Sequence, residues 1–170
     1  MNKRLLLALL PLLALACGLL IPPPTPAPTP SPIEETAAPT AGADHVVVRI
    51  FRTDGDLASL LLDHAQAAAN LGLVPVLEFD ATWCAPCQAV SASIEEENPL
   101  MMKALKGVYL IRADADDWGW ENENLSFEAI PVYFKLDADG RPTGDQIDGS
   151  AWGKDIPENF APVLDEFFHR

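Results

Sequence analysis

Residues 74–87 read VPVLEFDATWCAPC, an apolar run followed within a few residues by a Cys-x-x-Cys pair. The run predicts a buried strand over Val74–Asp80, and Cys84 then stands at the start of a predicted helix. At a helix N-terminus, unpaired backbone N–H groups and the helix dipole favour a thiolate. Cys87 lies about one turn further on, close enough to form a disulfide. The stretch therefore indicates a site for thiol–disulfide exchange.

Other uses of a Cys-x-x-Cys pair fit this chain less well. Pro86 suits the helix start, because its missing N–H would have no partner there. A zinc site needs four ligands, but there is no second Cys pair, and His45, His64 and His169 are isolated. Haem attachment needs a His where Gln88 stands. A structural disulfide is the remaining alternative, although so short a loop restricts little chain entropy.

The segment Glu78–Cys87 resembles the strand and active-site segment of the thioredoxin superfamily. A second match lies at residues 130–134 (IPVYF), similar to the strand start that carries the family's cis-proline. Residues 97–110 are more similar to the C-terminal thioredoxin-like domains of bacterial envelope disulfide-interchange reductases. The resemblance implies an α/β, thioredoxin-like fold, with a central mixed β-sheet flanked by helices.

The resemblance also implies a division of labour between the two cysteines. Cys84 is the attacking thiolate, which forms a mixed disulfide with a client protein, and Cys87 then attacks Cys84 and releases the reduced client. Client contacts are expected from the residues beside the pair and from the cis-proline segment: Trp83, Ala85, Pro86, Ile130 and Pro131. Ordinary packing is the alternative interpretation of Trp83.

Glu78 is the third candidate catalytic residue, because the family carries a buried Asp six residues before the first Cys. Burial would raise the pKa of Glu78 and let it take the proton from Cys87, directly or through water. The alternative is a solvent-facing Glu78. The family's lysine partner of this carboxylate has no equivalent, since Leu110 aligns with it.

The remaining elements follow from periodicity and turn signals. Strands are expected at 45–51, 74–80, 108–113, 132–136 and 145–148. Helices are expected from Asp54 or Asp56 to about Leu71, at 84–97, 100–105 and 121–129, and from Asp155 or Asn159 to about His169. Asp139-Gly140 supplies the turn of a closing hairpin. The acidic loop 114–123 carries two tryptophans, which are expected to pack against the sheet; a wider substrate surface is the alternative.

Residues 1–16 are typical of a bacterial lipoprotein signal peptide. Lys3 and Arg4 precede the apolar stretch Leu5–Ala16, and Cys17 follows directly. Cleavage before Cys17 and lipid on its sulfur are expected, with an uncleaved membrane anchor as the alternative. The chain has three cysteines, so lipidation of one leaves only the redox pair.

Residues 17–43 are interpreted as the lipidated Cys and a Pro-rich tether, and residues 44–170 as one thioredoxin-like domain. Eight of the chain's 16 prolines lie between Pro22 and Pro39. Such a composition favours a semi-rigid, extended spacer. The domain is therefore expected outside the cytoplasm, in the cell envelope or periplasm, tethered to a membrane by lipid.

The acidic composition bears on partners. The net charge is −14, and loss of Lys3 and Arg4 with the signal peptide would leave −16. Such a charge opposes binding to nucleic acid. The expected partners are client proteins with disulfides or thiols and a membrane thiol transporter as electron donor, with no cofactor or metal beyond the Cys84–Cys87 disulfide.

A reducing or relaying role is expected, because oxidising relatives carry His where Pro86 stands. The alternative function is a non-catalytic thioredoxin-fold module that holds copper or a client protein.

Overall fold

The computed structural model describes residues 44–122 and 125–170 of the chain. The expected signal peptide, Cys17 and the Pro-rich tether lie outside these described residues. Among the helices that are described, none is long and apolar enough to cross a membrane.

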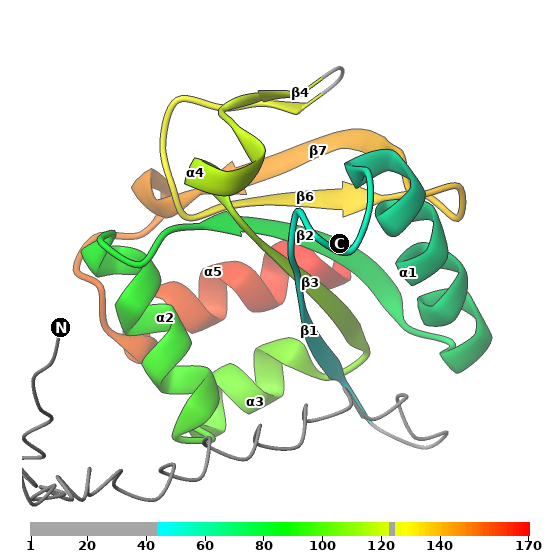
Figure 1. Cartoon of the computed structure of the whole chain (residues 1–170). Coiled ribbons are helices and arrows are strands. Elements are labelled where there is room, and N and C mark those ends of the chain that lie inside the picture. The colour runs from blue at the N-terminus through cyan, green and yellow to red at the C-terminus, as the bar shows by residue number, and fades with distance from the viewer. Residues whose placement is uncertain (1–43, 123–124) are drawn as a thin grey trace, which may run out of the picture. The chain divides into compact units, whose positions relative to one another are not determined.

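Five strands form one mixed sheet in the order β1–β3–β2–β6–β7 (Figure 1). Their bounds are β1 Val46–Ile50, β2 Val74–Asp80, β3 Val108–Asp114, β6 Val132–Leu136 and β7 Pro142–Asp148. Strands β1, β3 and β2 are parallel, whereas β6 and β7 are antiparallel to their neighbours. Strand β2 is therefore the middle strand, with a partner on each side.

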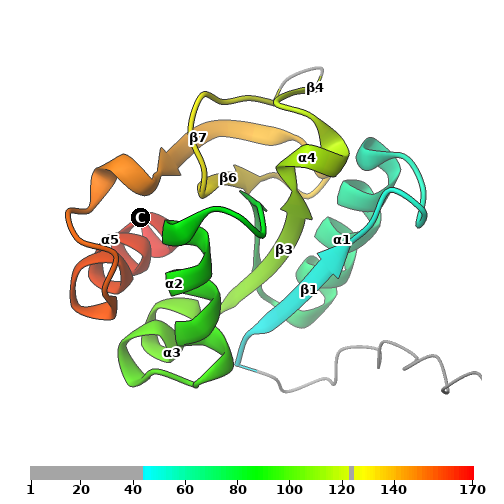
Figure 2. The ribbon, with the colours of Figure 1, turned by 60° about the vertical axis from the view of Figure 1, so that its left-hand side comes forward.

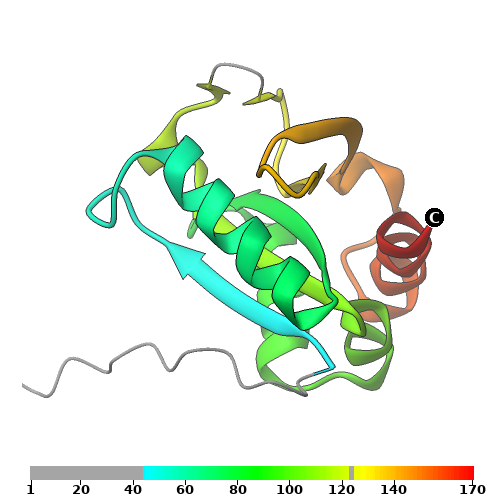
Figure 3. The same cartoon turned by 90° about the vertical axis from the view of Figure 1, so that its right-hand side faces the viewer.

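Helices cover both faces of this sheet (Figures 2 and 3). They are α1 Leu57–Leu71, α2 Ala85–Glu95, α3 Pro99–Leu105, α4 Ala115–Trp118 and α5 Pro157–His169, with a short 3-10 turn, η1, at Gly149–Ala151. One core cluster joins α1 and α4 to the sheet, and a second joins α2, α3 and α5 to its other face. This is the expected thioredoxin-like architecture.

Alternation along β2 decides which of its side chains face the active-site helix. Leu77 and Phe79 enter the core on the α1 side, and Val76 enters the core on the α2 side. Since successive strand residues point to opposite faces, Glu78 and Asp80 share the α2 side with Val76. Two carboxylates are thus placed between the middle of the sheet and the helix that carries the cysteines.

The predicted turns around α1 and the closing hairpin are confirmed. Asp56 caps α1 by accepting a hydrogen bond from the Ser59 N–H, and Gly72 ends it at φ 70°. Gly140 has φ 75°, and a Cβ there would lie 2.5 Å from the backbone nitrogen of Leu62. Only glycine fits between the hairpin turn and α1.

The helix predicted over residues 121–129 is wrong. The helix of this region is α4, which Asp114 caps and Gly119 ends at φ 85°. Beyond it, β4 Glu121–Asn122 pairs with β5 Leu125–Ser126 in a small antiparallel ladder. Leu125 and Phe127 are buried in the core on the α1 side. Tertiary burial of these two side chains outweighs the weak local preference for helix.

Of the two predicted starts of the last helix, Asp155 lies two residues before the observed start, and Asn159 is wrong. Helix α5 begins at Pro157 after Ile156, which makes no side-chain cap. Asp155 instead accepts a hydrogen bond from the Trp152 indole at 3.0 Å, and Asn159 lies inside the first turn. Proline at the first helical position needs no donor partner, which explains a start without a polar cap.

Candidate active site

Cys84 and Cys87 form a disulfide at the N-terminus of α2, with their Cα atoms 5.2 Å apart. Cys84 is the N-cap residue, and its Sγ accepts a hydrogen bond from the backbone N–H of Cys87 at 3.2 Å. Ala85 and Pro86 fill the first turn between them. The Cys87 N–H therefore points toward the sulfur that the resemblance assigns as nucleophile, and the helix N-terminus favours negative charge on Cys84.

The cis-proline segment lies against the disulfide. The Ile130–Pro131 peptide bond is cis, as the resemblance implied. The carbonyl oxygen of Ile130 lies 3.6 Å from Cys84 Sγ, and the Ile130 side chain packs on the cysteine cluster. The Pro131 carbonyl accepts a hydrogen bond from the Gly149 N–H at 2.9 Å, which ties this segment to η1.

Trp83 is the most exposed large apolar side chain of the described residues, at 60%. Its indole N–H donates to Asp116 Oδ2 of α4 at 2.6 Å. The ring therefore stands beside the disulfide with its polar edge held and much of its surface open to solvent. The other two tryptophans of this region are Trp118, which is buried, and Trp120, which is half-buried with its ring centre 5.2 Å from that of Phe127. Their predicted packing role is confirmed.

Glu78 is fully buried, in agreement with the prediction of a buried carboxylate. Its Oε2 accepts from Arg112 Nε at 2.6 Å, and its Oε1 accepts from the Tyr133 hydroxyl at 3.0 Å. The prediction that Glu78 lacks a cationic partner on the next strand is therefore wrong. Strand register explains the error, because Leu110 pairs with Val76 and Arg112 stands directly opposite Glu78.

These contacts pull the pKa of Glu78 in both directions. Burial raises the pKa of Glu78 and outweighs the lowering by the Arg112 charge and the two hydrogen bonds; the Asp80 carboxylate raises it further. Burial also raises the pKa of Tyr133 well above its ordinary value, so Tyr133 remains a donor. Burial opposes the charge of Arg112, but both carboxylates outweigh it and raise the pKa of Arg112. Arg112 is thus always positive.

Four polar residues of the cluster around Glu78 were not predicted: Arg49, Asp80, Ser91 and Arg112. Asp80 accepts from both terminal nitrogens of Arg49 and from Arg112 at 2.7 Å. The same Arg112 nitrogen donates to Ser91 Oγ at 2.6 Å, and the Ser91 hydroxyl donates to the Cys87 carbonyl at 2.9 Å. The sequence signal for Asp80 was present, since it follows Glu78 by two positions in an otherwise apolar strand.

A cavity of about 300 Å³ adjoins this cluster along α2. Its lining residues come from β1, β2, the β2–α2 connection and α2: Arg49, Asp80, Ala81, Thr82, Gln88, Ser91, Ala92 and Glu95. The cavity is large enough for water and is rich in hydrogen-bonding groups. Asp80 and Arg49 therefore face a solvent-accessible space, whereas Glu78 is enclosed.

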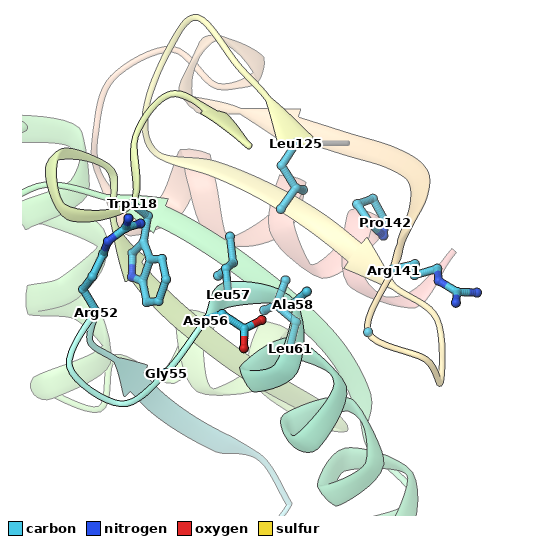
Figure 4. Close-up of a pocket in the computed structure, with 11 residues that line it drawn as sticks. Arg52, Gly55, Asp56, Leu57, Ala58, Leu61, Trp118, Leu125, Arg141 and Pro142 are labelled. Atoms are coloured by element: carbon cyan, nitrogen blue, oxygen red, sulfur yellow. The ribbon is translucent and has the colours of Figure 1, made fainter. Parts of the chain in front are cut away.

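A larger cavity of about 490 Å³ lies elsewhere, between the start of α1, α4, β5 and the β6–β7 turn (Figure 4). Its walls include Leu57, Leu61, Leu125 and Trp118, and the Arg52 guanidinium lies 5.4 Å from the Trp118 ring centre. None of the predicted site residues lines it. In the described part of the chain, no group of three or more His, Cys, Asp or Glu side chains could hold a metal ion.

Exchange chemistry requires one thiol that can attack, a second thiol that can resolve, and a surface on which a client chain can lie. Cys84, Cys87 and the Ile130–Pro131 segment meet these requirements on the expected fold. The class so defined is a thiol–disulfide oxidoreductase. The Thioredoxin family model matches residues 64–161, more than half of the chain, and the chain belongs to the thioredoxin family.

Individual relatives are distant. The chain is 30% identical over 71 residues to a thioredoxin H-type protein of Fagopyrum esculentum, a match covering 42% of this chain and 58% of that protein. It is 29% identical over 89 residues to a thioredoxin of Geodia cydonium, covering 52% and 79% respectively. Among solved structures, Schistosoma mansoni thioredoxin aligns with a TM-score of 0.45 and 18% identity, covering 75% of this chain and 96% of that one.

Proposed function

We propose that this protein is an extracytoplasmic, membrane-tethered reductase or electron relay for disulfides of client proteins. The observation that carries the proposal is the Cys84–Cys87 disulfide capping α2 beside the cis Ile130–Pro131 bond. Pro86 between the cysteines favours the reducing direction, because it places no side-chain donor that would stabilise the thiolate further.

The reaction transfers two electrons to the client in two exchanges. In the reduced protein, the Cys84 thiolate attacks a client disulfide, forms a mixed disulfide and expels one client thiolate. Cys87 then loses its proton to Glu78, directly or through water, and attacks Cys84 Sγ. The Cys84–Cys87 disulfide forms, the second client thiolate leaves and takes up a proton, and the client is reduced.

Client recognition is assigned to the surface around the disulfide. Trp83 offers an exposed apolar face, and Ala85 and Pro86 form the turn between the sulfurs. The backbone of Ile130, next to Pro131, can pair with an extended client segment as one strand pairs with another. The acidic charge of −14 favours neutral or basic clients over nucleic acid.

The tethered location rests on the N-terminal sequence. Removal of residues 1–16 and lipid on Cys17 would hold residues 44–170 to a membrane through the Pro-rich segment. A reductase outside the cytoplasm has no cytoplasmic reductant at hand, so a membrane thiol transporter is the proposed electron donor. Its dithiol would reduce Cys84–Cys87 by the same two exchanges.

The test is the reduction potential of the Cys84–Cys87 couple together with turnover of a protein disulfide such as insulin. If the protein is a reductase, the potential should be about −270 mV, and Cys84→Ser should abolish turnover. A potential of about −120 mV would identify an oxidant and contradict the proposal. Client binding without turnover would instead support the non-catalytic binding module.

A further inference from the structure

A row of polar side chains crosses the sheet on the side of α2. Consecutive strand partners place Arg49 of β1 opposite Arg112 of β3, Arg112 opposite Glu78 of β2, and Glu78 opposite Tyr133 of β6. Asp80 stands two residues beyond Glu78 on the same face. The parallel ladders therefore bring the two carboxylates of β2 together with Arg49 and Arg112, which are far from them in the sequence.

Hydrogen bonds join these side chains into one chain of contacts. Arg49 binds both oxygens of Asp80, and Arg112 bridges Asp80 to Glu78 with 2.7 and 2.6 Å contacts. Glu78, Asp80 and Arg112 are 0%, 4% and 8% exposed, so three of the four charges lie away from bulk water. At such depth, removing one charge leaves its partner uncompensated.

The charges of this cluster balance only when Glu78 is ionised. Arg49 and Arg112 supply two positive charges, and Asp80 and Glu78 supply two negative charges. A proton taken up by Glu78 leaves the cluster with a net charge of +1, which the low-dielectric surroundings oppose. The two arginines thus limit, without reversing, the rise that burial causes in the pKa of Glu78.

The same cluster contacts the active-site helix. Arg112 donates to Ser91 Oγ at 2.6 Å, and Ser91 donates to the carbonyl of Cys87 at 2.9 Å, one turn back along α2. Arg112 therefore contacts the proposed proton acceptor directly and, through Ser91, the residue that bears the resolving thiol. No other described residue hydrogen-bonds to both Glu78 and α2.

We propose that Asp80 and Arg112, with Arg49 behind them, are positioning residues that set the charge state of Glu78 and so the pH range in which Cys87 resolves a mixed disulfide. The inference rests on the proposed role of Glu78 as proton acceptor. It extends that role to residues that touch neither the sulfurs nor the client.

The direction of each effect follows from the charges that surround Glu78. Asp80 lies on β2, the same strand as Glu78, and Arg112 lies on β3. Tyr133 lies on β6, and Arg49 lies on β1 behind Asp80. Helix α2 contributes Ser91 and the cavity-lining Glu95. Loss of the Asp80 charge removes a repulsion and eases ionisation of Glu78. Loss of the Arg49 charge leaves Asp80 undercompensated and opposes that ionisation.

The experiment isolates the resolving step in the full-length protein. Reduced protein is mixed with 5,5′-dithiobis(2-nitrobenzoate), whose disulfide the Cys84 thiolate attacks with release of one thionitrobenzoate. Cys87 then attacks Cys84 Sγ and releases the second thionitrobenzoate as the protein disulfide forms. Stopped-flow absorbance of this second release, from pH 5 to pH 9, gives the resolution rate and the midpoint of its fall toward acid.

Asp80→Asn should move this midpoint to lower pH, and Arg49→Met should move it to higher pH. Arg49 is the safer of the two positions for folding, because its side chain is 34% exposed. Glu78→Gln should abolish the fall in resolution rate whose midpoint the other two variants shift. Arg141→Met is the matched control, since Arg141 is a 72% exposed arginine on the β6–β7 turn, and it should leave the midpoint unchanged.

The outcomes separate this inference from the function it extends. Opposite shifts in Asp80→Asn and Arg49→Met, both absent when combined with Glu78→Gln, support it. Shifts of the midpoint in the same direction in both variants overturn the inference. It is also overturned if neither variant shifts the midpoint while Glu78→Gln still abolishes the acid fall. In either case Glu78 remains the acceptor. A midpoint that persists in Glu78→Gln overturns both the acceptor role and this inference, yet leaves insulin reduction by Cys84 intact.

Discussion

The indole of Trp83 donates a hydrogen bond to the carboxylate of Asp116 at 2.6 Å, and so α4 is joined to the residue that precedes Cys84. Asp116 belongs to a short helix inserted after β3, whereas Trp83 lies in the turn before α2. The ring is 60% exposed despite this bond. The bond therefore limits how the ring turns without covering the surface that a client would meet.

Asp116→Ala should weaken client binding more than chemistry. Without its acceptor, the Trp83 ring is ordered only when a client binds, which costs free energy of binding. We therefore expect KM to rise about 3- to 10-fold, with kcat nearly unchanged. Steady-state reduction of a protein disulfide measures both constants. Asp117→Ala is the control, because Asp117 is an exposed carboxylate on the same turn. An equal effect of the two variants would point to general charge rather than to the Trp83 contact.

Cys84 should react with alkylating agents well before Cys87 in the reduced protein near neutral pH. Cys84 is the cap of α2, where the helix N-terminus stabilises a thiolate, and Cys87 lies inside the first turn with 1% exposure. Peptide mapping after brief iodoacetamide treatment measures the order. In cells, Cys87→Ser should accumulate mixed disulfides with clients; faster modification of Cys87 would reverse the assigned roles.

Glu78→Gln should change how stability depends on pH. Because burial raises the pKa of Glu78, the folded state holds its proton to higher pH than the unfolded chain, whose value is near about 4.3. The wild-type protein therefore loses stability as pH rises from that value through the raised folded pKa, then levels off. Gln lacks this loss. As pH rises from 4 to 8, the urea midpoint of the variant should therefore increase relative to that of the wild type. A decrease relative to the wild type would contradict the raised pKa of Glu78.

Ser91→Ala should slow resolution about 3- to 10-fold, because it removes the hydroxyl between Arg112 and the Cys87 carbonyl, a contact of about 1 kcal/mol. Ser93→Ala is a matched control. Ser93 also donates its hydroxyl to a carbonyl of α2, that of Val90 at 2.7 Å, but without a bond to Arg112. The second thionitrobenzoate release measures both variants. Equal slowing in both would assign the effect to helix stability alone.

Mass spectrometry of the protein from its native membrane should find a mature chain that begins at Cys17 with a diacylglyceryl group on its sulfur. The expectation follows from the apolar stretch that ends directly before this cysteine. Cys17→Ser should release the protein from the membrane fraction. A mature chain that retains residues 1–16 would instead identify an uncleaved anchor, and one that starts beyond Cys17 a secreted form.

Most of the fold was predictable because its signals are local. The apolar run of β2, the Cys-x-x-Cys helix start, the Asp56 cap and the Gly72 end each lie within one element. The region after β3 was not predictable in this way. Residues 121–129 have no strong period, and their pairing as β4 and β5 follows from the burial of Leu125 and Phe127.

By itself, the sequence determined the chemistry of the site. Two cysteines one turn apart after a buried strand define a dithiol, and a carboxylate six residues earlier in that strand is predicted to lie inside. Chain-local spacing is enough for the dithiol, because a helix turn has fixed geometry. The buried carboxylate follows from the apolar strand around it and from the resemblance to the thioredoxin superfamily.

Only the tertiary structure decided which charges meet Glu78. Arg49, Glu78 and Arg112 lie on three strands, and a shift of one residue in either ladder would turn one of these side chains to the opposite face. Register between parallel strands is set by helices packed on both faces of the sheet, which a reading of each strand alone does not contain. For this reason, the pairing of Glu78 with position 112 rather than with position 110 is a property of the assembled sheet.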